Sequence, residues 1–280
     1  TATPNTATIT ITGANDAPVI TTGLVTGSIT ETDATISTTG DFSVADPDAS
    51  DTVTASVQSV TIAGSFNGTV PSALTNSSNQ QLLNMLSLNP VAGTVLDADQ
   101  PTGSDLTWTF SSAAGGNSAF DFLAKNETLE LTYNVQLSDN SNGPNNDADT
   151  TIVVTVTGTN DTPDITIDAG NDTGSTTEDL NPVSINTAEF LQDTGTISFI
   201  DVDLANTGNL STSFISATPN NGASLSDALN TALQDLSSAF TLSGDGVSTA
   251  ARKGSAKWDF SIDNALTQYL AAGDSITATS

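Results

Sequence analysis

Polar and apolar residues alternate along most of this chain in short runs, and that alternation has the period of a half-buried β-strand. The clearest run is 128–137, in which every second position is apolar. The run 52–62 alternates as far as Val57 and resumes at Val60 after a slip of one residue. Clusters of Gly, Pro, Asn and Asp separate the runs and predict turns. Strands are expected at 6–11, 17–22, 28–30, 34–44, 52–62, 106–110, 128–137 and 151–156.

Two stretches have helical spacing instead, 80–86 and 225–236, and Leu229, Leu233 and Leu236 share one face of the second. Each predicts a short helix inserted among the strands. Trp108 and Trp258 lie in the middle of alternating runs, each with Phe two residues later. Both are predicted core anchors, with stacking on a sugar as the alternative.

One motif occurs twice and divides the chain. Thr-Gly-x-Asn-Asp-x-Pro follows a run of β-formers at 12–18 and again at 157–163. A strand that stops at Gly and is followed by Asn-Asp and Pro indicates that one domain ends and another begins. We expect 1–13 to be the final strand of a preceding repeat, 14–158 a complete repeat and 159–280 a second repeat that is truncated at its C-terminus. Seven or so short strands per repeat predict an all-β sandwich.

Charge narrows the range of functions. The chain has 32 acidic and 4 basic residues and a net charge of -28, and most of the acids are Asp. This charge opposes binding to nucleic acid and to anionic lipid. The preference for Asp over Glu suits loops that chelate a hard cation. A plainer explanation of the negative charge is an acidic surface adapted to a salty environment. We expect both to contribute.

Catalysis is opposed by what the sequence lacks. It has no His and no Cys, which removes the commonest general base and every thiolate site. It has no Gly-x-Ser-x-Gly motif. No apolar run approaches the roughly 18 residues that cross a membrane, so no membrane insertion is expected. The chain is therefore predicted not to be an enzyme. Its N-terminus has neither a start Met nor a signal peptide, so we expect it to be a segment of a longer polypeptide.

The expected strand order gathers acids at the two ends of the first repeat. Successive strands place Asp16, Asp46, Asp48 and Asp139 at one pole, and Glu31 and Asp161 at the other. Four carboxylates at one pole repel unless they are screened or bridged, and Ca²⁺ takes about six to eight oxygen ligands. These acids are also ordinary turn residues. A metal site and a set of turns both fit the pattern.

Five elements occur in the same order twice: Thr-Gly-x-Asn-Asp-x-Pro, Thr-Glu, Phe-x-x-x-Asp-x-Asp (two residues shorter in the second copy), Trp-x-Phe, and Phe/Tyr-Leu-Ala-x-x-Glu/Asp. This order resembles the VCBS repeat of giant bacterial surface adhesins, including those of the RTX type. The resemblance covers nearly the whole chain. It implies tandem Greek-key β-sandwich domains, cadherin-like and Ig-like, with Ca²⁺ at the joints between them.

The resemblance also implies which residues hold the ion. The joint between the two repeats would use Glu31 of the first repeat, Asn160 and Asp161 of the linker, and Asp201 and Asp203 of the second repeat. The matching site at the upper pole of the first repeat would use Asn15, Asp16, Asp46, Asp48 and Asp139. That upper site would take its Glu from the preceding domain.

The leading hypothesis is an extracellular, cell-surface extender, stiffened by calcium, that holds the binding tip of an adhesin away from the cell. Its partners would be neighbouring repeats of the same polypeptide, while other regions contact surface glycans or other cells. The alternative is a repeat that itself binds carbohydrate or another cell-surface ligand, most plausibly through 71–96 and 225–236.

Overall fold

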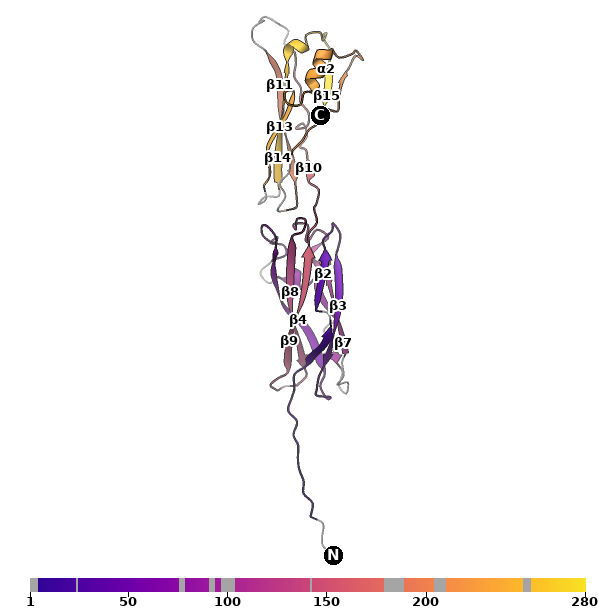
Figure 1. Cartoon of the computed structure of the whole chain (residues 1–280), viewed down its shortest axis with the longest axis vertical. Helices are drawn as coiled ribbons and strands as arrows, with labels where there is room; N and C mark the ends of the chain where they lie inside the picture. Colours follow the sequence, from indigo (N-terminus) through magenta and orange to yellow (C-terminus); the bar gives the residue numbers. More distant parts are fainter. Residues whose placement is uncertain are drawn as a thin grey trace. The chain divides into compact units, whose positions relative to one another are not determined.

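The computed structural model forms two compact units, Thr1–Asn160 and Asp161–Ser280, which are described separately below as unit 1 and unit 2 (Figure 1). Strands are the main regular structure of both, and the prediction of an all-β sandwich is confirmed. The structure describes residues 5–23, 25–75, 79–90, 94–96, 104–141, 143–178, 189–203, 210–248 and 253–280.

Unit 1 is a sandwich of two sheets. One sheet has the order β1 (Val19–Gly23), β3 (Ser37–Ala45), β7 (Ser104–Ser111) and β5 (Leu86–Asn89). The other has the order β2 (Thr26–Thr30), β9 (Asp147–Thr157), β8 (Thr128–Asp139), β4 (Val53–Ser65) and β6 (Thr94–Leu96). The β2–β9 pair is parallel and the other pairs are antiparallel.

The slip of one residue in the sequence pattern is a β-bulge. In the β4–β8 ladder, Val57 lies opposite Val135, while Ser59 lies opposite Asn134, so Gln58 is the extra residue. A bulge restores the alternation on the same face of the sheet after one unpaired residue. Val53 and Val60, on either side of it, are therefore both buried.

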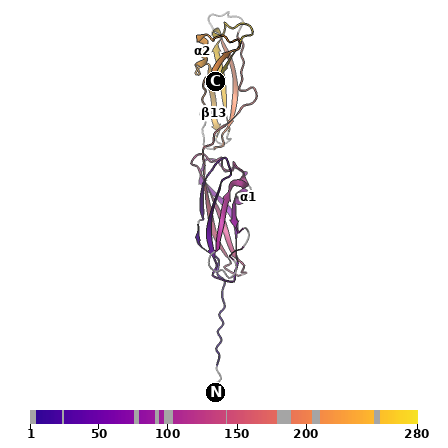
Figure 2. The same ribbon diagram turned by 90° about the vertical axis from the view of Figure 1, so that its right-hand side faces the viewer.

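The first inserted helix is shorter than expected. Helix α1 spans Gln80–Leu83 and lies at the flank of the sandwich in Figure 2. The predicted extension to Leu86 is wrong because Leu86 begins β5 and pairs with Phe110 of β7. Short apolar runs fit a helix and a strand equally well, and here a ladder with β7 decided the outcome. The hydroxyl of Tyr133 donates to the carbonyl of Leu82 at 2.9 Å and anchors the helix.

Trp108 is the largest fully buried side chain of unit 1, as expected for a core anchor. Strand β3 lies against its indole ring at Gly40, where any side chain would collide. A Cβ on Gly40 would lie 2.6 Å from ring atoms of Trp108. Beside it, the Thr39 hydroxyl donates to the Trp108 carbonyl at 2.6 Å.

Replacing Gly40 by Ala should therefore destabilise unit 1 by about 1–3 kcal/mol, because a well-packed ring must move to admit the methyl group. Urea unfolding measures the change. Asp41→Ala, on the neighbouring exposed position of the same strand, is the matched control and should shift the unfolding free energy by less than about 0.5 kcal/mol. Equal effects of the two variants would show that the ring is not confined.

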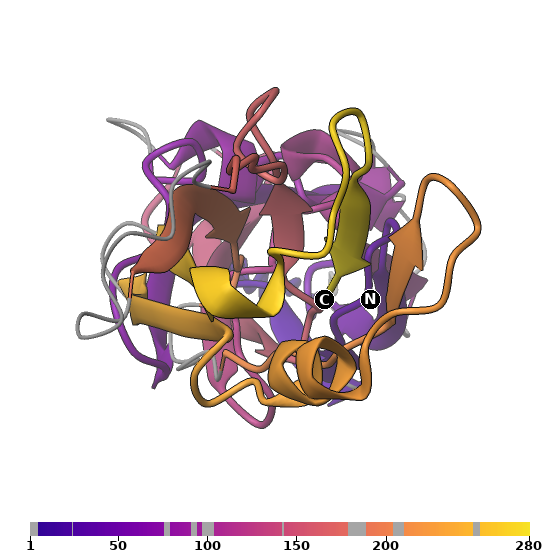
Figure 3. The same ribbon diagram turned by 90° about the horizontal axis from the view of Figure 1, so that it is seen from above.

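Unit 2 contains one sheet in the order β10 (Asp164–Thr166), β11 (Phe190–Ile200), β14 (Lys253–Asp263) and β13 (Phe240–Ser248). A separate pair joins β12 (Ser216–Pro219) to β15 (Ile276–Thr279). The predicted second helix is present as α2, Asp227–Gln234, with Leu229 and Leu233 buried. Leu236 lies beyond its end. Figure 3 shows α2 and the β12–β15 pair from above.

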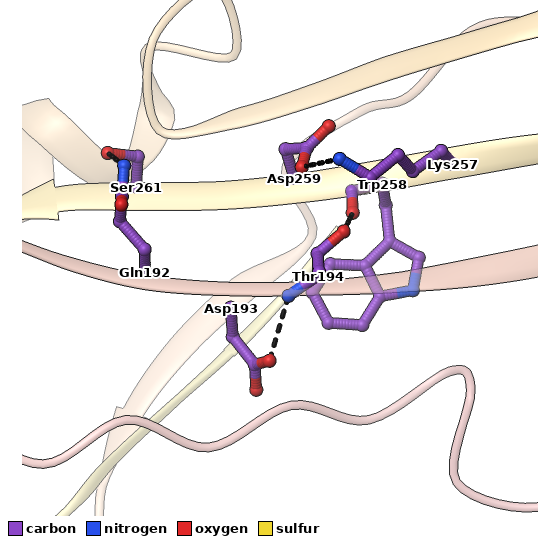
Figure 4. A network of polar contacts seen from close by, with 7 residues as sticks. All are labelled: Gln192, Asp193, Thr194, Lys257, Trp258, Asp259 and Ser261. Atoms are coloured by element: carbon purple, nitrogen blue, oxygen red, sulfur yellow. Dashed lines mark hydrogen bonds and ion pairs between the residues drawn. The ribbon is translucent and has the colours of Figure 1, made fainter.

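Unit 2 repeats the tryptophan arrangement of unit 1. The Thr194 hydroxyl donates to the Trp258 carbonyl at 2.8 Å, as Thr39 does to Trp108, and a Cβ on Gly195 would lie 2.5 Å from the Trp258 ring. Figure 4 shows Thr194 and Trp258 facing each other across β11 and β14, with Gln192 donating to Ser261 further along. The core role predicted for Trp258 is confirmed by its burial.

Candidate metal sites

Acidic turns meet at one pole of unit 1, here called the acidic pole. Asp46 directly follows β3, Asp139 ends β8, and Asn15 and Asp16 precede β1. One carboxylate oxygen from each of Asp46, Asp51 and Asp139 lies within 4.8 Å of the others. Because β3 and β8 end at the same edge of the sandwich, residues more than 90 positions apart in the sequence become neighbours.

Hydrogen bonds tie the remaining predicted residues to this cluster. The backbone N–H of Asp16 donates to Asp48 Oδ2 at 2.7 Å, and that of Asp48 donates to Asp46 Oδ1 at 2.8 Å. The Asn15 side-chain amide donates to Asp139 Oδ2 at 3.1 Å. All five residues predicted for the upper site, Asn15, Asp16, Asp46, Asp48 and Asp139, are therefore brought together within unit 1.

Asp46 is the most deeply buried acid of the acidic pole. Its side chain is 1% exposed, and its Oδ2 is buried with no hydrogen-bond partner. Burial raises the pKa of Asp46 above its usual value, against the backbone N–H of Asp48, which lowers it. Further raising comes from the charges of neighbouring carboxylates, namely Asp139, Asp51 and Asp48. The pole therefore contains a carboxylate oxygen that has lost water and gained no donor.

Asp139 differs from Asp46 in its hydrogen bonding. Burial acts to raise the pKa of Asp139, but hydrogen bonds from Ser141 and Asn15 outweigh it and hold that pKa below its usual value. The backbone N–H of Ser141 donates to Asp139 Oδ1 at 2.7 Å. Asp139 therefore keeps its negative charge beside Asp46 and adds to the repulsion there.

Asp51 is a member of the cluster that the sequence prediction omitted. It follows Asp46-Pro47-Asp48, and its backbone N–H donates to the Asp48 carbonyl at 3.0 Å. This bond closes a turn that folds Asp51 back toward Asp46. The available signal was that Asp51 is the third Asp within six residues of a turn-rich run. In such a run Asp also has a purely local explanation, since it favours turns.

These donors fit a hard cation. The acidic pole offers carboxylate oxygens from several turns, and the unpartnered Oδ2 of Asp46 has its lone pairs available. Ca²⁺ prefers such oxygen ligands and accepts flexible geometry. The oxygens lie within 4.8 Å of one another. Two unit negative charges at that largest separation repel by roughly 3 kcal/mol at an effective dielectric constant near 20, and a bound divalent ion would offset this repulsion.

The same turn occurs in unit 2. The backbone N–H of Asp161 donates to Asp203 Oδ2 at 2.9 Å, and that of Asp203 donates to Asp201 Oδ1 at 3.0 Å. Asp201 and Asp203 are both buried. The bonds match those of Asp16, Asp48 and Asp46, so the equivalence drawn from the sequence holds at the level of individual donors.

Glu31 occupies the opposite end of unit 1, directly after β2, and is 1% exposed. Its Oε2 accepts hydrogen bonds from the backbone N–H of Thr159 at 2.8 Å and from its hydroxyl at 2.9 Å. Its Oε1 is buried without a hydrogen-bond partner. A carboxylate oxygen of Asp121 lies within 4.8 Å of one of Glu31. Asp121 is not among the residues that the sequence predicted for a metal site.

The predicted joint draws Glu31 and Asn160 from unit 1, and Asp161, Asp201 and Asp203 from unit 2. Each set has been placed within its own unit. That the two sets hold one ion together stays a prediction.

Comparisons with known proteins leave the family open. No family model matches the chain, and no curated protein matches it. The CooA pilin subunit from enterotoxigenic Escherichia coli is 12% identical with a TM-score of 0.30, over 48% of this chain and 90% of that one. The seventh PapD-like (ASH) domain of human CEP192 is 9% identical with a TM-score of 0.29, over 56% and 96% respectively. Neither bears on function. Among the described residues, no helix is long and apolar enough to cross a membrane.

Proposed function

We propose that this chain binds Ca²⁺ at the acidic ends of its sandwich units and serves as an extender segment of a large extracellular bacterial adhesin, of the VCBS-repeat kind. One observation carries the metal proposal: Asp46 has a buried, unpartnered Oδ2, and one of its carboxylate oxygens lies within 4.8 Å of carboxylate oxygens of Asp51 and Asp139. A buried carboxylate is ordinarily paired, hydrogen-bonded or bound to metal.

Calcium suits this arrangement and this location. Extracellular calcium modules bind at about 10⁻⁴–10⁻³ M, which suffices outside cells. Without the ion, the carboxylates at each end of a unit repel one another, which favours open conformations of the turns that carry them. With the ion, those turns are joined by a single centre. A string of such units would hold a distal binding region at a set distance from the cell surface.

The partners of this segment follow from the same proposal. Its immediate neighbours would be further repeats of the same polypeptide, and contacts with glycans or other cells would be made elsewhere in the adhesin. The alternative, a repeat that itself binds carbohydrate, placed its site partly on 225–236. There Leu229 and Leu233 of α2 are buried in the core. The alternative stays a prediction.

Small-angle X-ray scattering of the whole chain tests the extender proposal. With millimolar calcium we expect a narrower distribution of maximum dimensions than with a chelator, because the ion fixes the acidic turns. Asp203→Asn should remove most of this difference, while Asp41→Asn, an exposed acid on β3, should preserve it. Identical profiles with calcium and with chelator would contradict the proposal.

A further inference from the structure

Strands β2 and β9 of unit 1 lie side by side and point in the same direction (Figure 1). The pairing runs from Thr26 opposite Val153 to Thr30 opposite Thr157. β2 lies near the beginning of unit 1 in sequence, and β9 is its last strand. This pair therefore joins the two segments through which the chain enters and leaves the unit.

Tension along the polypeptide loads this pair in shear. It pulls β2 from its N-terminal side, through residues 12–18, and β9 from its C-terminal side, through Gly158. Because the strands are parallel, those two sides lie at opposite ends of the pair. One strand is therefore pulled lengthwise along the other, and the hydrogen bonds between them share the load instead of breaking one after another.

Hydrogen bonds close the pair at both of its ends. The backbone N–H of Val153 donates to the Val25 carbonyl at 2.9 Å, and that of Glu31 donates to the Thr157 carbonyl at 2.8 Å. These bonds lie where tension enters each strand. β9 is also paired with β8 along its whole other edge, so β2 is the strand that must slide.

The Glu31 side chain adds a lock beyond the end of β9. Its Oε2 accepts hydrogen bonds from the backbone N–H of Thr159 at 2.8 Å and from the Thr159 hydroxyl at 2.9 Å. Glu31 is buried, and hydrogen bonds that are shielded from water are stronger than exposed ones. Tension that enters unit 1 from its C-terminal side reaches Thr159 before it reaches β9. The carboxylate thus fastens the exit of the unit to the end of β2.

The same pair protects the core of unit 1. β9 contributes Ile152, Val154 and Val156, which are fully buried. β1 precedes β2 on the loaded path, but its ladder with β3 has a register shift between Ile20 and Thr22. Loss of β1 leaves β2 in place on β9, whereas sliding of β2 uncovers the edge of β9. Resistance to tension therefore depends on the β2–β9 pair.

We propose that the β2–β9 pair and the Glu31–Thr159 contact form a mechanical clamp, which keeps unit 1 folded when tension acts along the polypeptide. The presence of such tension rests on the proposed extender function, because a segment between a cell and a distal attachment is pulled from both sides. The strength of the clamp is a property of unit 1 alone. Its hydrogen bonds join protein groups, so the clamp works without a bound ion.

Single-molecule force spectroscopy of the whole chain in chelator tests the clamp, with handles on introduced cysteines in a chain that has no Cys of its own. Handles at Thr12→Cys and Thr162→Cys pull β2 and β9 in shear. Handles at Thr12→Cys and Pro144→Cys pull both strands from the same end, so their bonds break in turn. All three positions are exposed. We expect a several-fold higher unfolding force in the first geometry, since forced unfolding follows the unfolding rate.

Thr159→Val tests the lock, because it keeps the shape of the side chain and removes the hydroxyl that Glu31 accepts. At constant force in the shear geometry it should unfold about tenfold faster, the value of one hydrogen bond to a charged group. In the other geometry its unfolding rate should equal that of the parent chain. Thr155→Val makes the same exchange elsewhere on β9 and should change neither rate.

Equal unfolding forces in the two geometries would overturn the clamp. An effect of Thr159→Val that is absent, or equal in the two geometries, would overturn the role assigned to Glu31, since the hydroxyl would then add only general stability or none. The scattering comparison with calcium and with chelator tests the extender function separately. A clamp that fails here leaves that comparison unchanged, so the two proposals can be rejected independently.

Discussion

Calcium should raise the melting temperature of unit 1, and Asp46→Asn should remove most of that rise. With a Kd of about 10⁻⁴ M, calcium at about twenty times Kd stabilises the folded state by about 1.8 kcal/mol. For a unit of this size that corresponds to roughly 4–7 °C. Fluorescence of Trp108 in a Trp258→Phe background follows unit 1 alone, because Trp108 lies in its core.

Asp46→Asn separates calcium binding from ordinary stability. In chelator the variant should be at least as stable as the parent chain, because it removes a buried charge beside Asp51 and Asp139. Its Oδ1 can still accept the backbone N–H of Asp48, so the turn is preserved. Asp41→Asn removes a charge from an exposed position of β3 and should leave the calcium response intact. An undiminished response in Asp46→Asn would place the ion elsewhere.

Gly158→Ala should strongly destabilise unit 1. A Cβ there would lie 2.2 Å from the carbonyl oxygen of Leu123 and 2.4 Å from that of Ala124. Both contacts are with backbone, which cannot rotate away as a side chain can. The backbone N–H of Gly158 also donates to the Glu127 carbonyl at 2.8 Å, so the strand cannot shift without losing that bond. We expect a loss of about 3 kcal/mol or more in the free energy of unfolding.

Gly13→Ala is the matched control, since it changes the same position of the other copy of the motif. In dilute solution it should leave the unfolding free energy of unit 1 unchanged, because its Cβ meets nothing within 4 Å. Urea titrations followed by Trp108 fluorescence compare the two variants. Equal stabilities would contradict the close approach described for Gly158.

The acidic pole was predictable because strand alternation fixes which turns share an end of the sandwich. Asp46, Asp48 and Asp139 each follow a strand whose apolar pattern is plain in the sequence, so their meeting required only the strand order. The bulge after Val57 was visible for the same reason, as a break in a period of two.

Asp51 and Asp121 could not be found in that way. Each lies inside an irregular segment, where a hydrogen bond such as that from Asp51 to the Asp48 carbonyl decides the direction of the chain. Periodicity does not encode such turns. Leu86 was missed for a different reason. Its spacing from Leu82 and Leu83 suits a helix, and only pairing with β7, a contact distant in sequence, makes it a strand residue.

The repeated Gly-x-Asn-Asp motif combines two physical roles. In unit 1, Gly158 permits the close approach of β9 to the turn at Leu123. The final Asp of the motif uses its backbone N–H to hold the Asp-x-Asp turn, as Asp16 does with Asp48 and Asp161 does with Asp203. The motif thus joins the end of one sandwich to the acidic turns of the next domain in sequence.

Anomalous diffraction from a crystal of the whole chain grown with terbium in place of calcium tests the metal site most directly. We predict an anomalous peak within bonding distance, about 2.3–2.6 Å, of carboxylate oxygens of Asp46, Asp51 and Asp139. A crystal that shows these three side chains ordered and no peak among them would contradict the proposed calcium site.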